Sequence, residues 1–292
     1  MINPKIFTGK PSRYGDIICF IPFITYLKKV YPESYVTFFI DKTCAPVTQF
    51  LLNYPGIDRF QISLEEDKVT KLDSEGRYDI IFNLYNGLTD PRYYNFHNVQ
   101  KENFIMSEVF TTDGLRKINP VEYNILTNEE KYPRLVRYFP VSRTEKTIAI
   151  WPFSGYGDSE MSRKRSPSVE WWAILIQGLA SKGYKILEFG HPNNRSLKEK
   201  SHDVKDLRHL SLFDSVKASL GCDLVITTDS GPSHIFGAYG ARQICLYSPY
   251  QRDHFQNFEA MTPMNYKNNL TLFCGIDNIN SIKQEEVLNI IK

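Results

Sequence analysis

Short apolar runs alternate with longer amphipathic stretches through most of the chain. The runs are rich in β-branched and aromatic residues and predict buried strands, at 5–8, 35–40, 59–62, 78–84, 147–151, 185–189, 222–226 and 243–247. Apolar residues at helical spacing predict helices between them, at 16–31, 44–52, 168–182, 211–220, 235–240 and 281–291. This alternation predicts parallel sheets joined by right-handed crossovers, the α/β class.

Two stretches interrupt the pattern. Residues 85–120 are less regular and rich in Tyr, Phe and Asn, and we expect one helix there, over 101–110. Residues 131–146 contain two prolines and five basic residues, which is typical of a connection between domains. A chain of 292 residues also exceeds one ordinary core. The expected parts are doubly wound domains at 1–140 and 141–280 and a terminal helix at 281–292, whose return to the first domain stays open.

The sharpest local pattern is the small polar turn at 227–234, between a predicted strand and a predicted helix. Backbone N–H groups at a helix N-terminus point outward and bind anions such as phosphate. Ser230 adds a hydroxyl, Gly231 lets an anion approach the backbone, and His234 can donate a ring N–H. Taken alone, the turn is explained equally well by a helix cap made from Asp229 and Ser230.

Two more polar turns follow predicted strands, at 152–157 and 190–194. In doubly wound folds, ligands bind at the carboxyl ends of the parallel strands. We therefore expect all three turns to line the same edge of one sheet and to share one ligand.

Composition narrows the function classes. Hydrophobic residues make up 42% and charged residues 23% of the chain, a balance typical of globular proteins. The net charge is only +2, which argues against general nucleic-acid binding by electrostatic attraction. Five cysteines without a C-x-x-C pair indicate reduced thiols in a cytoplasmic protein, and the six histidines show no zinc-binding spacing. The apolar run at 17–27 contains Pro22 and has no cleavage site, so we interpret it as neither a secretion signal nor a membrane span.

Four blocks, in order along the chain, resemble one known family. They are Gly15-Asp16 with Pro22, Leu27-Lys28 and Tyr31-Pro32; Trp151-Pro152-Phe153-Ser154; Lys164 with Pro167 and Trp171; and Asp229-Ser230-Gly231-Pro232-Ser233-His234 with Ala238-Tyr239-Gly240. Together they resemble the heptosyltransferase family, glycosyltransferase family 9. The resemblance implies a GT-B fold, in which an acceptor-side and a nucleotide-sugar-binding Rossmann-like domain face each other across a cleft. It also implies inverting, metal-independent transfer of a heptose or related sugar, without a cofactor, from a nucleoside diphosphate to a glycan, lipid-linked glycan or protein hydroxyl.

The resemblance assigns roles to the matching residues. Asp16 matches the general base that takes the proton from the acceptor hydroxyl, with an ordinary helix-capping aspartate as the alternative. Lys164 matches the phosphate-binding lysine, and Ser154 is a second candidate donor to phosphate. Without a metal, the leaving diphosphate needs such cations and dipoles. We interpret the flanking Arg163 and Arg165 as a solvated basic loop.

In the 229–234 turn, the resemblance assigns diphosphate binding to Ser230, Gly231 and His234. Asp229 then orders the turn or bonds a hydroxyl of the donor sugar, because a second free carboxylate would repel the diphosphate.

The nucleotide base is expected beside His209 and Leu210, and the ribose beside His191. Relatives often place an acidic residue after the ribose turn, where it suits ribose hydroxyls. This chain has Asn193 and Asn194 there, which leaves the donor nucleotide open between ADP, GDP and others.

Two other functions stay open. A nucleotide-sugar epimerase would use His191, His209 and Asp229 as acid and base groups, and a non-catalytic subunit would only bind the nucleotide sugar. Aromatic residues within 85–110 are candidates for stacking on a sugar acceptor, with core packing as the alternative. We expect a cytoplasmic location. Peripheral contact with the inner membrane face is a further possibility, and its basic surface would be made by Lys5, Lys10, Arg13, Arg134, Arg137 and Arg143.

Overall fold

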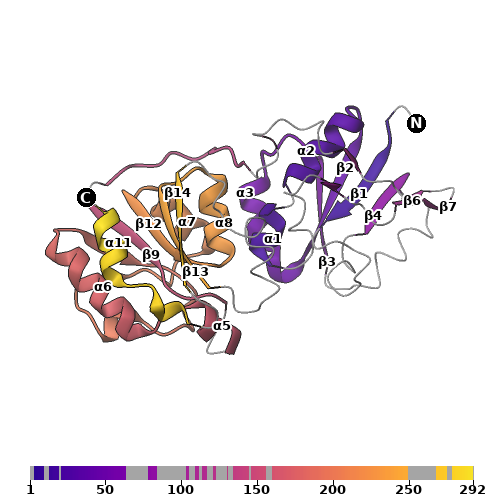
Figure 1. Cartoon of the computed structure of the whole chain (residues 1–292). Helices are drawn as coiled ribbons and strands as arrows, with labels where there is room; N and C mark the ends of the chain where they lie inside the picture. The colour runs from indigo at the N-terminus through magenta and orange to yellow at the C-terminus, as the bar shows by residue number, and fades with distance from the viewer. Residues whose placement is uncertain are drawn as a thin grey trace. The chain divides into compact units, whose positions relative to one another are not determined.

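The chain divides into two compact units, Met1–Val136 and Arg137–Lys292 (Figure 1). The computed structural model describes residues 3–9, 13–19, 21–63, 78–83, 103–104, 109–111, 114–116, 121–122, 130, 134–144, 146–155, 160–248, 268–274 and 278–291. Each unit contains one six-stranded sheet.

The sheet of the second unit is parallel throughout, in the order β11-β10-β9-β12-β13-β14. Its strands are β9 (Thr147–Trp151), β10 (Lys185–Glu188), β11 (Val204–Asp206), β12 (Leu224–Thr228), β13 (Gln243–Tyr247) and β14 (Asn269–Phe273). Numbered along the chain, this is the 3-2-1-4-5-6 order of dinucleotide-binding folds. The order reverses between β9 and β12, and the loops that leave these two strands therefore diverge at the carboxyl edge.

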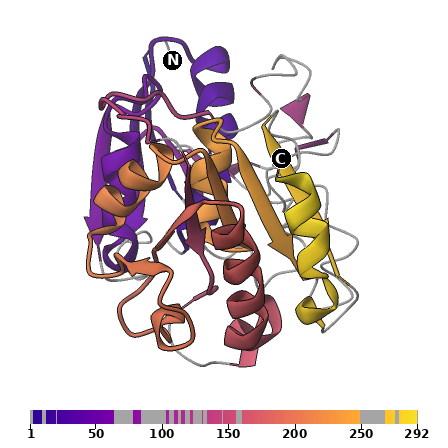
Figure 2. The same cartoon turned by 90° about the vertical axis from the view of Figure 1, so that its left-hand side faces the viewer.

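Helices cover both faces of this sheet (Figures 1 and 2). On one face, α6 (Val169–Ser181) buries Trp172 in the main core. On the other, α7 (Leu212–Leu220) and α8 (Gly231–Ala238) meet Trp151, whose indole donates to Ser219 Oγ at 2.9 Å and packs 5.6 Å from the Phe236 ring. β9, β12 and β13 are buried along their whole length, as expected for parallel strands covered on both sides.

The terminal helix α11 (Gln284–Ile290) lies beside α6, within the second unit (Figure 2). Its leading segment is fixed by Trp171 Nε1, which donates to the Ile282 carbonyl at 2.6 Å. Its end is fixed by Lys182 Nζ, which donates to the carbonyls of Leu288 and Ile291 at 2.7 and 2.8 Å. These contacts anchor the helix to its own unit.

The sheet of the first unit has the order β3-β2-β1-β4-β6-β7. The first four of these strands pair in parallel, while β6 and β7 are antiparallel. The bounds are β1 (Lys5–Gly9), β2 (Tyr35–Asp41), β3 (Arg59–Ser63), β4 (Ile80–Asn83), β6 (Val109–Thr111) and β7 (Gly114–Arg116), with a separate pair of β5 (Asn103–Phe104) and β8 (Val121–Glu122). Here the order reverses between β1 and β4.

The helices of the first unit begin after the first strand. They are α1 (Tyr14–Cys19), α2 (Ile21–Val30), η1 (Lys42–Val47) and α3 (Thr48–Leu51). Pro22 is the second residue of α2, where a missing N–H costs nothing. The helix expected over 16–31 is therefore two helices, and Pro22 marks the first turn of the second one.

The predicted α/β class with parallel sheets is confirmed, while one predicted element is wrong. The helix expected over 101–110 is replaced, among the described residues, by β5 and by β6, which pairs with β4. Strand pairing overrides a weak local preference there. The sequence also did not indicate β11, β14, α5 (Glu160–Arg165), η5 (Leu197–Glu199) or η7 (Ile279–Ser281).

Candidate functional site

Three loops leave the carboxyl edge of the second unit's sheet, at the ends of β9, β10 and β12. β9 and β12 pair directly, with Thr227 beside Trp151, so the loops that begin at Pro152 and Asp229 start next to each other. β10 pairs with the other side of β9 and brings the turn at 190–194 to the same edge. This is the place where open α/β sheets bind ligands.

The turn after β12 is held by serine hydroxyls. Ser233 Oγ donates to the Ser230 carbonyl at 2.6 Å, and the Ser230 N–H donates back to Ser233 Oγ at 3.4 Å. Ser230 Oγ donates to the Thr228 carbonyl at 3.1 Å. These bonds begin α8 at Gly231, so the positive end of the helix dipole opens at the carboxyl edge. His234 lies in α8 and is buried.

Asp229 is paired with a cation from a distant segment. Arg165 Nη2 lies 2.5 Å from Asp229 Oδ2, and both side chains are largely buried, at 16% and 7% exposure. This pair ties α5, which follows β9, to the turn after β12. The interpretation of Arg165 as part of a solvated basic loop is therefore wrong, whereas Arg163 is exposed as expected.

The loop after β9 is fixed to the segment around α5. The Ser154 N–H donates to Ser166 Oγ at 2.8 Å, and Ser162 Oγ donates to the Ser154 carbonyl. Ser154 itself is buried, and Lys164, from the last turn of α5, is half-buried. Ser154, Lys164 and the pair of Arg165 and Asp229 thus belong to one connected part of the edge.

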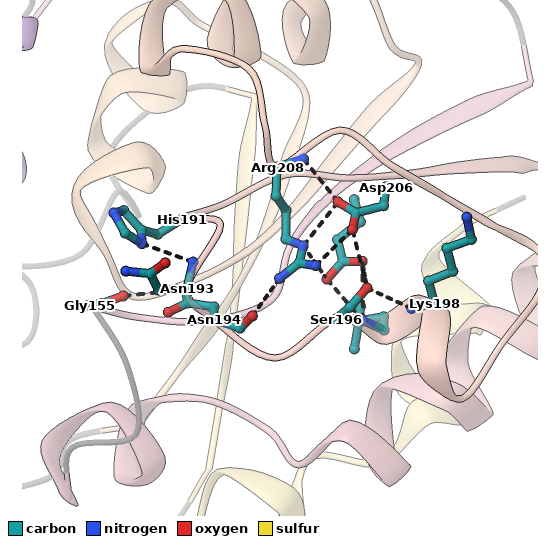
Figure 3. A network of polar contacts seen from close by, with 10 residues as sticks. Gly155, His191, Asn193, Asn194, Ser196, Lys198, Asp206 and Arg208 are labelled. Atoms are coloured by element: carbon teal, nitrogen blue, oxygen red, sulfur yellow. Dashed lines mark hydrogen bonds and ion pairs between the residues drawn. The ribbon is translucent and has the colours of Figure 1, made fainter.

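The loop after β10 is held by a network of polar contacts (Figure 3). Asn194 Nδ2 donates to the Gly155 carbonyl at 3.4 Å, which joins this loop to the loop after β9. Arg208 Nη1 donates to the Asn194 carbonyl at 2.5 Å. The Asn193 N–H donates to Nδ1 of the half-buried His191 at 3.2 Å.

Two carboxyl groups with opposite pKa shifts flank Arg208. Glu188 is fully buried, and burial raises the pKa of its carboxyl to about 7, although the Leu197 N–H and Arg208 favour the charged form. Asp206 accepts two hydrogen bonds from the Arg208 guanidinium, which lower the pKa of Asp206 to about 2. The same contact raises the pKa of Arg208 above its ordinary value.

The remaining candidates are placed as follows. His209 is exposed and Leu210 half-buried, and both precede Ser211, whose hydroxyl caps α7 by accepting from the Asp214 N–H at 3.1 Å. Asp16 belongs to the first unit, in α1, which follows β1, one of the two strands between which that sheet's order reverses. Of the aromatic residues within 85–110 that were predicted to bind the acceptor, Phe104 lies in β5, and those at 85–102 lie outside the described residues.

Sequence reasoning missed the contributions of Arg165, Arg208 and Glu188. Each has at least one partner nine or more residues away in the chain, and their residue types are common on surfaces. One available signal was Asp206 two residues before Arg208, beside a predicted helix start.

Among the residues that the structure describes, no group of three or more His, Cys, Asp and Glu side chains is arranged to hold a metal ion. Within the same residues, every helix is too short or too polar to cross a bilayer.

Comparison with known proteins gives one matching family and several solved structures of similar fold. The family model of glycosyltransferase family 9 (heptosyltransferase) matches residues 62–289, which include every candidate of the second unit and begin after Asp16. No curated protein sequence matches the chain.

Solved structures of low sequence identity share the fold. The ADP-heptose lipopolysaccharide heptosyltransferase II of E. coli is 17% identical, with a TM-score of 0.66 over 98% of this chain and 96% of that chain. The family 9 glycosyltransferase of Veillonella parvula is 17% identical, with a TM-score of 0.62 over 98% and 95%. The iron-containing dodecameric glycosyltransferase TibC of enterotoxigenic E. coli is 15% identical, with a TM-score of 0.51 over 84% of this chain and 57% of that chain.

Proposed function

Because the chain belongs to glycosyltransferase family 9, we propose that it moves a heptose or a related sugar from a nucleoside diphosphate to an acceptor hydroxyl. The observation that carries the proposal is the connected edge around β9 and β12. Two loops, the start of α8 and the basic helix α5 meet there, at the point where ligands bind in this topology.

The proposed diphosphate site uses the start of α8 and the cations of α5. Gly231 and His234 supply dipoles and donors, and the Ser230 hydroxyl would donate to the diphosphate in place of the Thr228 carbonyl. Lys164 supplies positive charge and Ser154 a hydroxyl. Arg165 balances the negative charge of Asp229, which would otherwise repel the diphosphate. A charge that grows on the leaving group is stabilised best by groups already held in place, and the contacts of Asp229 and Ser230 support this role.

The nucleoside is proposed to lie along the ends of β10 and β11. His191 borders the ribose, and the segment of His209 and Leu210 borders the base. Heptosyltransferase II of E. coli, which has a similar fold, acts on ADP-heptose by its name, and ADP is therefore the first nucleotide to test.

For the chemical step, we propose that Asp16 is the general base and that the anomeric carbon is inverted. Asp16 takes the proton of the acceptor hydroxyl as that oxygen attacks, and the diphosphate leaves with the bonding electrons. We propose that this step needs no metal, because the cations and dipoles of the second unit stabilise the leaving group.

The acceptor is proposed to be the precursor of a cell-surface glycan, such as a lipopolysaccharide, or a protein. The transfer is proposed to take place in the cytoplasm. A weak peripheral contact with the membrane would use the basic side chains of Lys5, Lys10, Arg13, Arg134, Arg137 and Arg143. Cosedimentation with anionic vesicles tests this contact, and the absence of salt-sensitive binding would contradict it.

The central experiment titrates the purified protein with ADP, GDP and UDP by calorimetry and then follows turnover of the matching sugar donors. We expect one diphosphate to bind best and Asp16→Asn to lose roughly 10²–10⁴-fold in transfer rate while it keeps nucleotide affinity. Glu33→Gln, at an exposed site of the same unit, is the control. Failure of all three nucleotides to bind would overturn the proposal.

The same assay separates the two alternatives. An epimerase would convert the donor sugar without any acceptor, and a binding subunit would bind nucleotide without turnover. The ion pair of Asp229 with Arg165 disfavours the epimerase. That reaction would use Asp229 as an acid or base, and here its carboxylate is bound to a guanidinium.

A further inference from the structure

We infer that Arg208 is a positioning residue for the nucleoside half of the donor, because it ties the loop at 190–197 to the end of β11. The inference rests on the proposed function, since it assigns the support of that same site. Arg208 is 11% exposed, so it acts through the loop and not by direct contact with the ligand.

The guanidinium of Arg208 is shared between an anchor and the loop (Figure 3). On one side, Nε and Nη2 donate to the two carboxylate oxygens of Asp206 at 3.0 and 2.7 Å, and the Arg208 N–H donates to Oδ1 at 3.0 Å. On the other side, Nη1 donates to the Asn194 carbonyl at 2.5 Å. The anchor lies at the end of β11, so the loop is fixed relative to the sheet.

The loop is also tied down on both sides of Asn194. Its side-chain amide reaches the Gly155 carbonyl, in the loop that carries the proposed phosphate contacts. Further along, the buried Glu188 accepts from the Leu197 N–H at 3.0 Å and from Ser196 Oγ at 3.2 Å. The loop at 190–197, the loop after β9 and the segment at 206–210 therefore share one network. Arg208 is the member that joins the segment at 206–210 to the loop at 190–197.

This network gives a structural role to Asn194, one of the two asparagines that follow the turn at 190–192. Asn194 faces the neighbouring loop with its amide and Arg208 with its carbonyl, so it braces the site. The exposed Asn193 is left to face solvent or ligand, and its N–H orients His191. A loop that is ordered before binding lowers the entropic cost of binding.

A fork of planar donors is required for this arrangement. Lysine is a point charge that can pair with Asp206 but cannot donate to Asp206 and Asn194 in the same geometry. Arg208→Lys therefore keeps the charge that balances Glu188 and Asp206 while it removes the brace.

The test measures donor KM, kcat and melting temperature for the full-length wild type and Arg208→Lys. We expect the donor KM to rise about tenfold, the loss typical of one charged hydrogen bond, with kcat within about twofold and little change in melting temperature. Arg242→Lys, an exposed arginine just before β13, is the matched control and is expected to behave as the wild type.

Asn194→Ala provides a second route, because it removes the amide contact with Gly155 without touching a charge. It is expected to raise donor KM as well, and the double variant is expected to cost less than the two effects combined, since both hold one loop. An unchanged KM in both variants, or a fall in melting temperature with normal KM, would show a purely structural clasp and overturn the inference. If the wild type binds no nucleoside diphosphate, the proposed function fails first, and the two failures are thus distinguishable.

Discussion

Replacement of Glu188 by Gln should remove a large part of the pH dependence of stability of the second unit. Glu188 is fully buried at the end of β10, and burial raises the pKa of its carboxyl from 4.5 to about 7. The folded state therefore holds a proton that the unfolded state releases. The stabilising contribution is complete below pH 4.5 and is lost as the pH rises through about 7.

The magnitude follows from the pKa shift. One pKa unit corresponds to about 1.4 kcal/mol, so the whole shift is worth about 3 kcal/mol across its pH range. Between about pH 5.5 and pH 8.5, the free energy of unfolding should fall by about 2 kcal/mol through this group alone. Gln keeps an oxygen that can accept from the Leu197 N–H and has no proton to lose, so the variant should lack this fall.

The assay is urea unfolding followed by tryptophan fluorescence at the two pH values. All three tryptophans, at positions 151, 171 and 172, lie in the second unit, and the signal therefore reports on that unit. Glu199→Gln, which removes an exposed carboxylate from η5, is the control and should retain the wild-type fall. If Glu188→Gln shows the same fall as the wild type, Glu188 is charged in the folded protein and the account of the network is wrong.

Three further predictions test the proposed site and the fold. Arg165→Met should leave the Asp229 carboxylate unpaired, weaken nucleoside diphosphate binding and destabilise the second unit by about 2–4 kcal/mol. Adding Asp229→Asn to this variant should restore much of the binding and of the stability. Calorimetry and urea unfolding of the single and double variants measure both effects. Gly221→Ala should weaken docking of the connecting segment, because a Cβ there would lie 2.6 Å from the Ser142 carbonyl oxygen, and faster proteolysis after residue 136 would be the readout. Dialysis against a chelator should leave the transfer rate within about twofold if cations and dipoles stabilise the leaving group, whereas a loss restored by an added divalent metal would refute metal independence.

Local chemistry allowed much of the fold to be predicted. The β-branched runs became β9, β12 and β13, which are buried on both sides and are therefore apolar at most positions. Ser168 begins α6 by accepting from the Trp171 N–H, a bond between residues three apart. The turn after β12 was evident for the same reason, since its serines bond to each other across three residues.

Elements with little local signal were not predicted. β11 is three residues long and β14 is only half-buried, and both are strands because β10 and β13 offer free edges to pair with. α5 carries three basic residues and no apolar stripe, so its sequence resembled a loop.

The sequence alone placed eight strands to within two residues and indicated the polar turns that follow β9, β10 and β12, because those features depend on residues within one turn of each other. Only the tertiary structure decided which charges meet at the carboxyl edge. Arg165 and Asp229 are 64 residues apart, and Arg208 reaches Asn194 across 14. The sheet order brings these charges together, and burial in the packed chain raises the pKa of Glu188. Burial and the distance between charges are properties of the packed chain, so no stretch of sequence shows them.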